Sequence, residues 1–298
     1  MKKLGLILAF LLIVYPCYPN ARTPENQVNK IIVFDMNEDQ RNELLAQKGQ
    51  SITIYSFIEN GDLKKTNEFS ISIPIRNIFT ANNEVFIFDN KALYLCEFSS
   101  DEIGLVKIAN LDSMIDLIYN VYQNNNDLIV TAAKIRAYEP LKLSLVIVEI
   151  DANKNTVLKE LKTVDWIHSV YTYNENGIKF AVITGIQDKL GKLMIYELKN
   201  NQLNRISTNE IPNDINTLSY VLIRNGIMYF SGWYGDIESD EAFPGIFAFD
   251  LKKQLFKTVI DTGLIANSIE INDLNKDGRN DLIWADTKNI YVESNIID

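Results

Sequence analysis

The chain is poor in the residues that many enzyme active sites and metal centres use. Its 298 residues include only two cysteines, Cys17 and Cys96, and one histidine, His168. A single histidine excludes zinc sites of the HExxH type and other multi-histidine centres. The sequence also contains no GxSxG, GxGxxG or P-loop motif. These absences remove several large enzyme classes and leave chemistry based on carboxylates open.

Long apolar runs are also lacking beyond the N-terminus. The chain begins with Lys2 and Lys3, and an apolar run follows over residues 4–14. That run is too short for a stable transmembrane helix and is typical of a secretory signal peptide, which we place at 1–21; an uncleaved membrane anchor is the alternative. No other segment is long and apolar enough to cross a bilayer. We therefore expect an exported mature domain at 22–298 with no transmembrane span.

Cysteine content and net charge limit the environment and the partners. Removal of the signal leaves Cys96 as the only cysteine, so the mature domain cannot form an internal disulfide. Cys17 follows Pro16, where bacterial lipoproteins have a small residue, so a lipid anchor is the less favoured alternative to a secreted or periplasmic protein of a bacterium. The formal net charge of -10 argues against nucleic acid and anionic membranes as partners. We expect a monomer.

Short β-branched and aromatic runs, bounded by Asn, Asp and Gly, recur along the chain and predict strand after strand. The second strand of each repeated unit is expected to begin at Glu43, Glu84, Asp127, Ile178, Ile227 and Asp281. These residues are roughly 40–55 positions apart, which is the length of one propeller blade. We therefore predict an all-β fold, a β-propeller of six blades of four antiparallel strands. A β-sandwich or two smaller β domains are the alternatives.

The last unit is one strand short in this pattern. It contains three apolar runs, at 268–271, 282–285 and 290–293, before the chain stops. Residues 22–30 are a candidate for the strand that would close the ring.

The nine residues 273–281 place oxygen-bearing groups at alternate positions, as a calcium loop requires. The candidate ligands are Asp273, Asn275, Asp277, the backbone carbonyl of Arg279, and Asp281. Gly278 stands at the sixth position, where the chain must turn sharply. We predict a Ca²⁺ site in this loop. The alternative is an Asn/Asp-rich turn that binds no ion.

A weaker copy of the same pattern lies at 35–43. Its candidate ligands are Asp35, Asn37, Asp39 and Glu43. Gln40 stands where glycine is wanted, and Glu43 is one methylene longer than the aspartate it replaces. A copy that keeps the turn without the ion is the favoured interpretation of this loop.

The run 273–283 resembles the motif of FG-GAP/VCBS repeat proteins, whose best-known members are the propellers of integrin α-chains. The resemblance is specific over 269–286, partial over 31–46 and architectural elsewhere. The Phe-Gly and Gly-Ala-Pro elements are absent, so the chain would be a divergent member. The resemblance implies a structural Ca²⁺ between the first and second strands of a blade, held by the five ligands named for 273–281. The four middle units lack the acidic loop, so we expect no ion there.

In propellers of this kind, loops between second and third strands lie on the face opposite the Ca²⁺ loops. Long loops of this type are expected at 134–140, 187–191 and 233–244. The last combines aromatic and acidic residues that suit a protein or carbohydrate partner: Trp233, Tyr234, Asp236, Glu238 and Phe243. The alternative is a solvated acidic loop with its aromatic side chains packed beneath it.

The sequence thus favours an exported Ca²⁺-binding propeller that acts as a binding or scaffolding module. The alternative function is that of a carboxylate-dependent carbohydrate-active enzyme, a glycoside hydrolase or lyase, on the same fold. Two central carboxylates about 5–10 Å apart would favour the enzyme. His168 is expected to be a structural residue at the end of a strand, with its hydrogen bonds satisfied.

Overall fold

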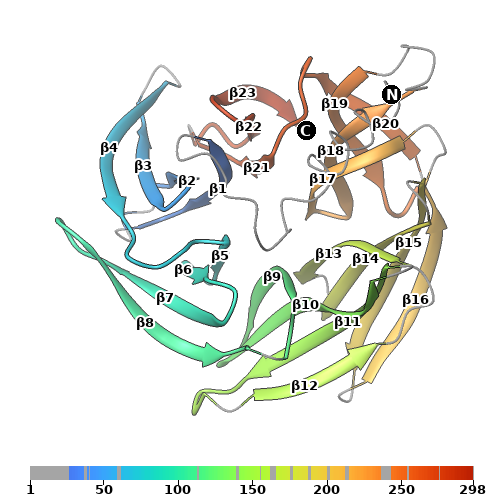
Figure 1. Cartoon of the computed structure of the whole chain (residues 1–298). Coiled ribbons are helices and arrows are strands. Elements are labelled where there is room, and N and C mark those ends of the chain that lie inside the picture. The colour runs from blue at the N-terminus through green and yellow to red at the C-terminus, as the bar shows by residue number, and fades with distance from the viewer. Residues whose placement is uncertain are drawn as a thin grey trace, which may run out of the picture.

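Six antiparallel sheets stand around a common axis in the computed structural model (Figure 1). The structure describes residues 27–36, 39, 41–58, 62–112, 114–138, 141–154, 156–161, 166–174, 177–186, 189–199, 202–211, 215–235, 243–253, 255–274 and 276–297, at some strand positions by the backbone alone. Within these ranges no helix has the length and apolar character that crossing a membrane would require. The predicted signal peptide at 1–21 and the alternative of a lipid anchor at Cys17 lie outside the described residues.

Each sheet is one blade. The first blade contains β1 (Val28–Phe34), β2 (Glu43–Lys48), β3 (Ser51–Phe57) and β4 (Leu63–Ser70). The second contains β5 (Asn77–Ala81), β6 (Glu84–Phe88), β7 (Ala92–Phe98) and β8 (Ile103–Asn110). The third contains β9 (Leu117–Asn124), β10 (Asp127–Tyr138), β11 (Leu141–Ile150) and β12 (Thr156–Leu161).

The second half of the ring follows the same order. The fourth blade contains β13 (Trp166–Asn174), β14 (Ile178–Ile186), β15 (Lys189–Lys199) and β16 (Gln202–Glu210). The fifth contains β17 (Ile215–Arg224), β18 (Ile227–Tyr234), β19 (Phe243–Asp250) and β20 (Leu255–Asp261). The sixth has three strands, β21 (Ser268–Asn272), β22 (Asn280–Ala285) and β23 (Ile290–Ile297). The prediction of a six-bladed propeller whose last blade is one strand short is confirmed.

Asparagine-rich turns set where the second strands begin. β2, β6, β10, β14 and β18 start at the predicted residues, and β22 starts one residue before Asp281. Asn82 and Asn83 have φ of 50° and 62°, and the next turn of this kind, Asn225-Gly226, has φ of 50° and 74°. Two successive positive φ angles make a type I′ hairpin turn, which asparagine and glycine adopt at low cost.

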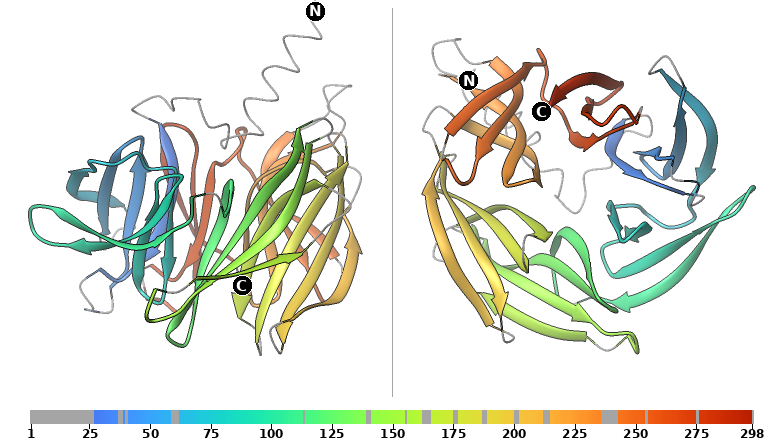
Figure 2. Two further views of the ribbon diagram at one scale, coloured as in Figure 1. Left: turned by 60° about the horizontal axis from the view of Figure 1, so that its bottom comes forward. Right: turned by 180° about the vertical axis from the view of Figure 1, so that it is seen from behind.

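The first strand of every blade lies nearest the axis. β1, β5, β9, β13, β17 and β21 each contact the next of these strands, and β21 contacts β1, so the ring is closed (Figures 1 and 2). Residues 28–30 belong to β1, in which Val28 and Lys30 pair with β2. These residues therefore do not complete the sixth sheet, contrary to the expectation of a closing strand over 22–30, and residues 22–26 of that segment lie outside the described part.

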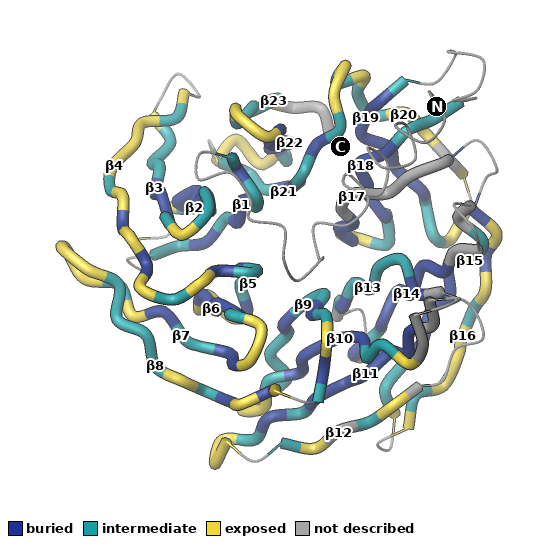
Figure 3. The backbone as a smooth tube through the Cα atoms, viewed as in Figure 1, coloured by how far each residue is buried: buried dark blue, intermediate teal, exposed yellow. Residues whose placement is uncertain are grey.

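The hydrophobic core is divided among the blade interfaces. One cluster of buried side chains lies between each pair of neighbouring blades. In Figure 3 the buried positions follow the inner and middle strands, and exposed positions gather on the outer ones. The cluster between the sixth and first blades contains six buried residues, whereas the cluster between the second and third contains fifteen. The described core is therefore thinnest where the two ends of the ring meet, a place we call the seam.

Two of the predicted long loops are wrong. Residues 134–140 are mostly part of the β10–β11 hairpin, and 187–191 are mostly part of the β14–β15 hairpin. Tyr138 pairs with Leu141, and Ile186 pairs with Lys189, so strand pairing continues to the tip of each hairpin. Of the three predicted loops, the connection after β18 leaves the longest stretch between paired strands, from 235 to 242, of which 236–242 lie outside the described residues.

Candidate functional site

The two acidic loops lie at the seam. The loop at 35–43 joins β1 to β2 in the first blade, and the loop at 273–281 joins β21 to β22 in the sixth. The Asn42 side chain amide donates a hydrogen bond to the Asn272 side chain oxygen across the seam, at 2.8 Å. The sequence pattern that recurs 238 residues apart is therefore brought together by ring closure.

Within the loop at 273–281, backbone N–H groups bond to acidic side chains. Asp273 accepts hydrogen bonds from the N–H of Asp277 at 3.1 Å and of Gly278 at 2.9 Å. Gly278 has φ of 85°, and its missing Cβ would meet no atom within 4 Å, so the requirement for glycine there is conformational. Asp281 is 1% exposed and accepts a hydrogen bond from the Leu274 N–H at 3.0 Å. The acids already form one compact turn.

The loop at 35–43 repeats two of these bonds at equivalent positions. Glu43 accepts a hydrogen bond from the Met36 N–H at 2.8 Å, as Asp281 does from Leu274. The Arg41 N–H donates to Asp39 at 2.7 Å, just as the Arg279 N–H donates to Asp277 at 2.9 Å. The two segments thus share local structure as well as composition.

The residues of the C-terminal loop are compatible with Ca²⁺. An ionised carboxylate has about four lone-pair sites, so acceptance of one or two N–H bonds leaves oxygen lone pairs for a cation. Asn37, Gln40 and Asn275 lie outside the described residues. In the described ranges no three His, Cys, Asp or Glu side chains form a group arranged to hold a metal. Ca²⁺ binding at either loop stays a prediction.

Burial affects the closing acid of the N-terminal loop. The pKa of Glu43 is raised, mainly because burial disfavours its charged form; the Met36 N–H opposes this and the charges of Asp39 and Asp35 add to it. A bound cation would favour the charged form of the same side chain.

The proposed partner residues lie at the end of the fifth blade. Tyr234 and Phe243 are strand residues that face each other across β18 and β19, rather than loop residues, and their ring centroids are 5.5 Å apart. Both rings also pack on the buried Phe247, at 5.8 and 6.2 Å. Trp233 is half-buried and pairs with Pro244. Asp236 and Glu238 lie outside the described residues. Tyr234 and Phe243 are therefore packed against the blade, as in the alternative of a solvated acidic loop with its aromatic side chains beneath it.

Four polar side chains from four inner strands interact electrostatically near the axis, and sequence reasoning missed them. Glu270 is 8% exposed, and burial raises the pKa of its carboxyl to about 7, against the opposing charges of Arg224 and Lys30. Burial lowers the pKa of the Lys30 ammonium to about 8, while Glu270 raises it. The ammonium of Lys30 lies 4.2 Å from the centre of the Phe79 ring.

Tyr171 completes this axial group. Burial raises the pKa of its hydroxyl to about 12; the Arg224 charge lowers it and the Glu270 charge raises it. Of the six inner strands, only β21 contains an acidic residue, Glu270. The inner strands therefore supply one carboxylate and no carboxylate pair. An isolated glutamate between Ile269 and Ile271 was the one signal available in the sequence.

His168 lies near the start of a strand, as expected, but the expectation that its hydrogen bonds are satisfied is not met. It lies in β13, and burial lowers the pKa of its imidazole to about 4. Its Nδ1 atom is buried without a hydrogen-bond partner in the described structure.

No protein-family model matches the sequence, and no curated protein matches it. Solved structures with the same fold do match. One is the extracellular domain of a protein described as a one component system of B. thetaiotaomicron, with a TM-score of 0.54 and 8% identity over 92% of this chain. A second is described as the extracellular domain of a hybrid two component system of B. thetaiotaomicron, with a TM-score of 0.53 and 10% identity over 92% of this chain. The chain spans 40% and 41% of the length of these two structures. At this identity the likeness shows the fold alone.

Proposed function

We propose that this chain is an exported propeller that acts as a binding or scaffolding module for a protein or carbohydrate partner, with a Ca²⁺ ion in the loop at 273–281. The observation that carries a binding role over an enzymatic one is the single carboxylate on the inner strands. A glycoside hydrolase needs two carboxyl groups, one on each side of the scissile bond. Glu270 alone, coupled to Lys30 and Arg224, does not supply that pair.

The proposed ion has a structural role at the seam. The seam has the smallest set of buried hydrophobic residues among the described interfaces, so hydrophobic burial contributes least there. Ca²⁺ would neutralise the acids gathered in the last blade's loop and fix that loop beside the first blade. An ion that binds only the folded state stabilises it by about 2.7 kcal/mol at a hundredfold excess over the dissociation constant.

The partner surface is proposed on the face opposite the acidic loops. The Asn225-Gly226 turn joins the first and second strands of the fifth blade, as the acidic loops do in the first and sixth blades. Because the strands are antiparallel, the connection after β18, at 235–242, lies at the other end of the blade from that turn. Export is supported by the predicted signal peptide and by the printed description of the similar solved structures as extracellular domains.

A calcium titration tests the first part of the proposal. Metal-free protein is titrated by calorimetry and melted with Ca²⁺ or with chelator. We expect a melting temperature that rises with Ca²⁺ in the wild type and does not rise in Asp277→Ala. Asp127→Ala, which removes an exposed acid at the start of β10, should keep the response. Absence of heat and of a shift in the metal-free wild type would show that the loop is only a turn.

Binding and turnover assays separate the two functions. Immobilised protein is exposed to a panel of defined polysaccharides and purified proteins, and each soluble polysaccharide is assayed for released reducing ends. Binding without release, weakened by the double change Asp236→Asn and Glu238→Gln, is the expected result. Release of reducing ends that Glu270→Gln abolishes would establish the enzyme instead.

A further inference from the structure

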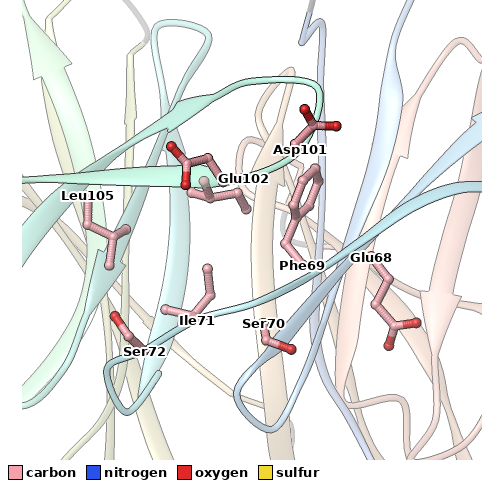
Figure 4. A pocket seen from close by; sticks show the side chains of 9 residues that line it. Glu68, Phe69, Ser70, Ile71, Ser72, Asp101, Glu102 and Leu105 are labelled. Carbon is pink, nitrogen blue, oxygen red and sulfur yellow. The ribbon is translucent and has the colours of Figure 1, made fainter.

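A groove lies on the outer rim between the first two blades, away from the seam and from the axis. It is formed by the end of β4, the chain that follows it, and the turn from β7 into β8, and encloses about 310 Å³. Figure 4 shows Asp101 and Glu102 on the side of that turn, across from Phe69 and Ile71. The groove is the outer mouth of the interface between the two blades.

The lining of the groove is mostly polar, and the apolar side chains at its floor are held by the core. Phe69 and Ile71 are each 6% exposed, and Ile71 belongs to the cluster between the first and second blades. Leu105 packs against the same cluster. A floor anchored in this way keeps its shape and offers a small apolar surface that the methylenes of a long side chain can contact.

The rim of the groove is acidic. Asp101 and Glu102 are exposed, and neither carboxylate forms an ion pair with any residue the structure describes. Glu68, on the opposite side, forms an ion pair with Lys65, so its charge is already balanced. The turn itself is fixed, because the Ser99 side chain donates to the Glu102 carbonyl at 2.9 Å and accepts from the Glu102 N–H at 3.1 Å. Two carboxylates are thus held beside an apolar floor.

Both walls of the groove also end in open strand edges. Among the strands that the structure describes, β4 pairs only with β3, and β8 pairs only with β7. An extended segment can add to an open edge through backbone hydrogen bonds while its alternate side chains point to one side. A lysine or arginine on such a segment would lay its methylenes on the apolar floor and place its charge between the two acids.

We propose that the groove between β4 and β8 binds an extended segment of a partner protein that carries a lysine or arginine. The acidic charge of the whole chain, -10, favours the approach of a basic segment. This site is separate from the face of the proposed function and does not depend on Ca²⁺. The failure of either proposal leaves the other standing.

The test uses a labelled octapeptide of alternating lysine and threonine, with a glutamate–threonine octapeptide as the comparison. Binding to the protein is followed by fluorescence anisotropy. The lysine peptide should bind and the glutamate peptide should not. The double change Asp101→Asn and Glu102→Gln should weaken binding roughly 5- to 10-fold, because each exposed ion pair contributes modestly.

Two further variants make the result specific. Glu84→Gln with Asp127→Asn also removes two exposed acids, but away from the groove, and should leave binding unchanged. Ser70→Arg places a cation on an exposed position of the groove and should abolish binding of the lysine peptide. It tests the groove independently if the Asp101→Asn and Glu102→Gln variant folds poorly. Equal weakening by both double variants would show general attraction to an acidic protein and overturn the proposal. No binding by the wild type would overturn it as well.

Discussion

Replacement of Ser268 by alanine should weaken the ring at one defined place. The Ser268 side chain is fully buried and bridges the seam, since it accepts a hydrogen bond from the Ile31 N–H and donates one to the Ile31 carbonyl, each at 3.2 Å. Ile31 is also fully buried. The variant leaves two backbone groups of Ile31 without these partners, and a buried unsatisfied group costs on the order of 1–3 kcal/mol.

The expected loss of unfolding free energy is about 2 kcal/mol. For a domain of this size that corresponds to a fall in melting temperature of roughly 4–8 °C. Urea titration of wild type and variant at equal protein concentration measures the difference, and the dependence on urea should keep its slope because the exposed surface is little changed.

Ser99→Ala is the matched control. Ser99 makes the same pair of bonds, to the N–H and the carbonyl of Glu102, but in an exposed turn where water replaces the lost hydroxyl. Its stability should change by less than about 0.5 kcal/mol. Equal effects of the two substitutions would refute the reasoning, because burial at the seam would then contribute nothing.

The remaining predictions concern the axis, the acidic loop, the core and the thiol. Because burial raises the pKa of Glu270 from 4.5 to about 7, the wild type should lose unfolding free energy on the order of 3 kcal/mol as pH rises across that window. Glu270→Gln should remove this loss in denaturant titrations at the two ends of the window. An unchanged dependence of stability on pH in the variant would contradict the prediction. Gly278→Ala and Gly263→Ala, at φ of 85° and 63° with open space around each, should each cost about 1 kcal/mol, but only the first should weaken Ca²⁺ binding in calorimetry. Phe230→Ala, at a fully buried ring, should cost about 3–5 kcal/mol in urea unfolding, and a loss below that of Ser268→Ala would be inconsistent with a packed core. Burial raises the pKa of Cys96 to about 12, so a thiol reagent should label the native protein only as fast as it unfolds, and rapid labelling would show an accessible thiol.

The architecture could be predicted from the sequence because its signals are local. Turn residues that accept positive φ, such as Asn82 and Asn225, mark where one strand ends and the next begins. The spacing of these turns then gives the number of blades. The three strands of the last blade were predictable for the same reason, since three apolar runs follow the fifth blade.

The features that sequence reasoning missed depend on distance in the chain. Lys30, Tyr171, Arg224 and Glu270 come from four blades, and no local pattern indicates that their charges interact near one axis. Hairpin length was misjudged at 134–140 because polar residues such as Lys134 also occur in strands whose side chains reach solvent. The acidic loops combine a local and a long-range feature. Their sequence pattern was recognisable in each segment, but their proximity depends on the contact between the first and sixth blades that closes the ring.

The seam also has a consequence for how the protein folds. All the strand pairs that the structure describes join neighbours in sequence, so each blade can form from local hairpins. The bonds between Ile31 and Ser268 join residues 237 apart, and such long-range contacts are slow to form because the chain between them must first be ordered. We therefore expect joining of the first and sixth blades to be the last and slowest step of folding, with five interfaces complete while the ring is still open.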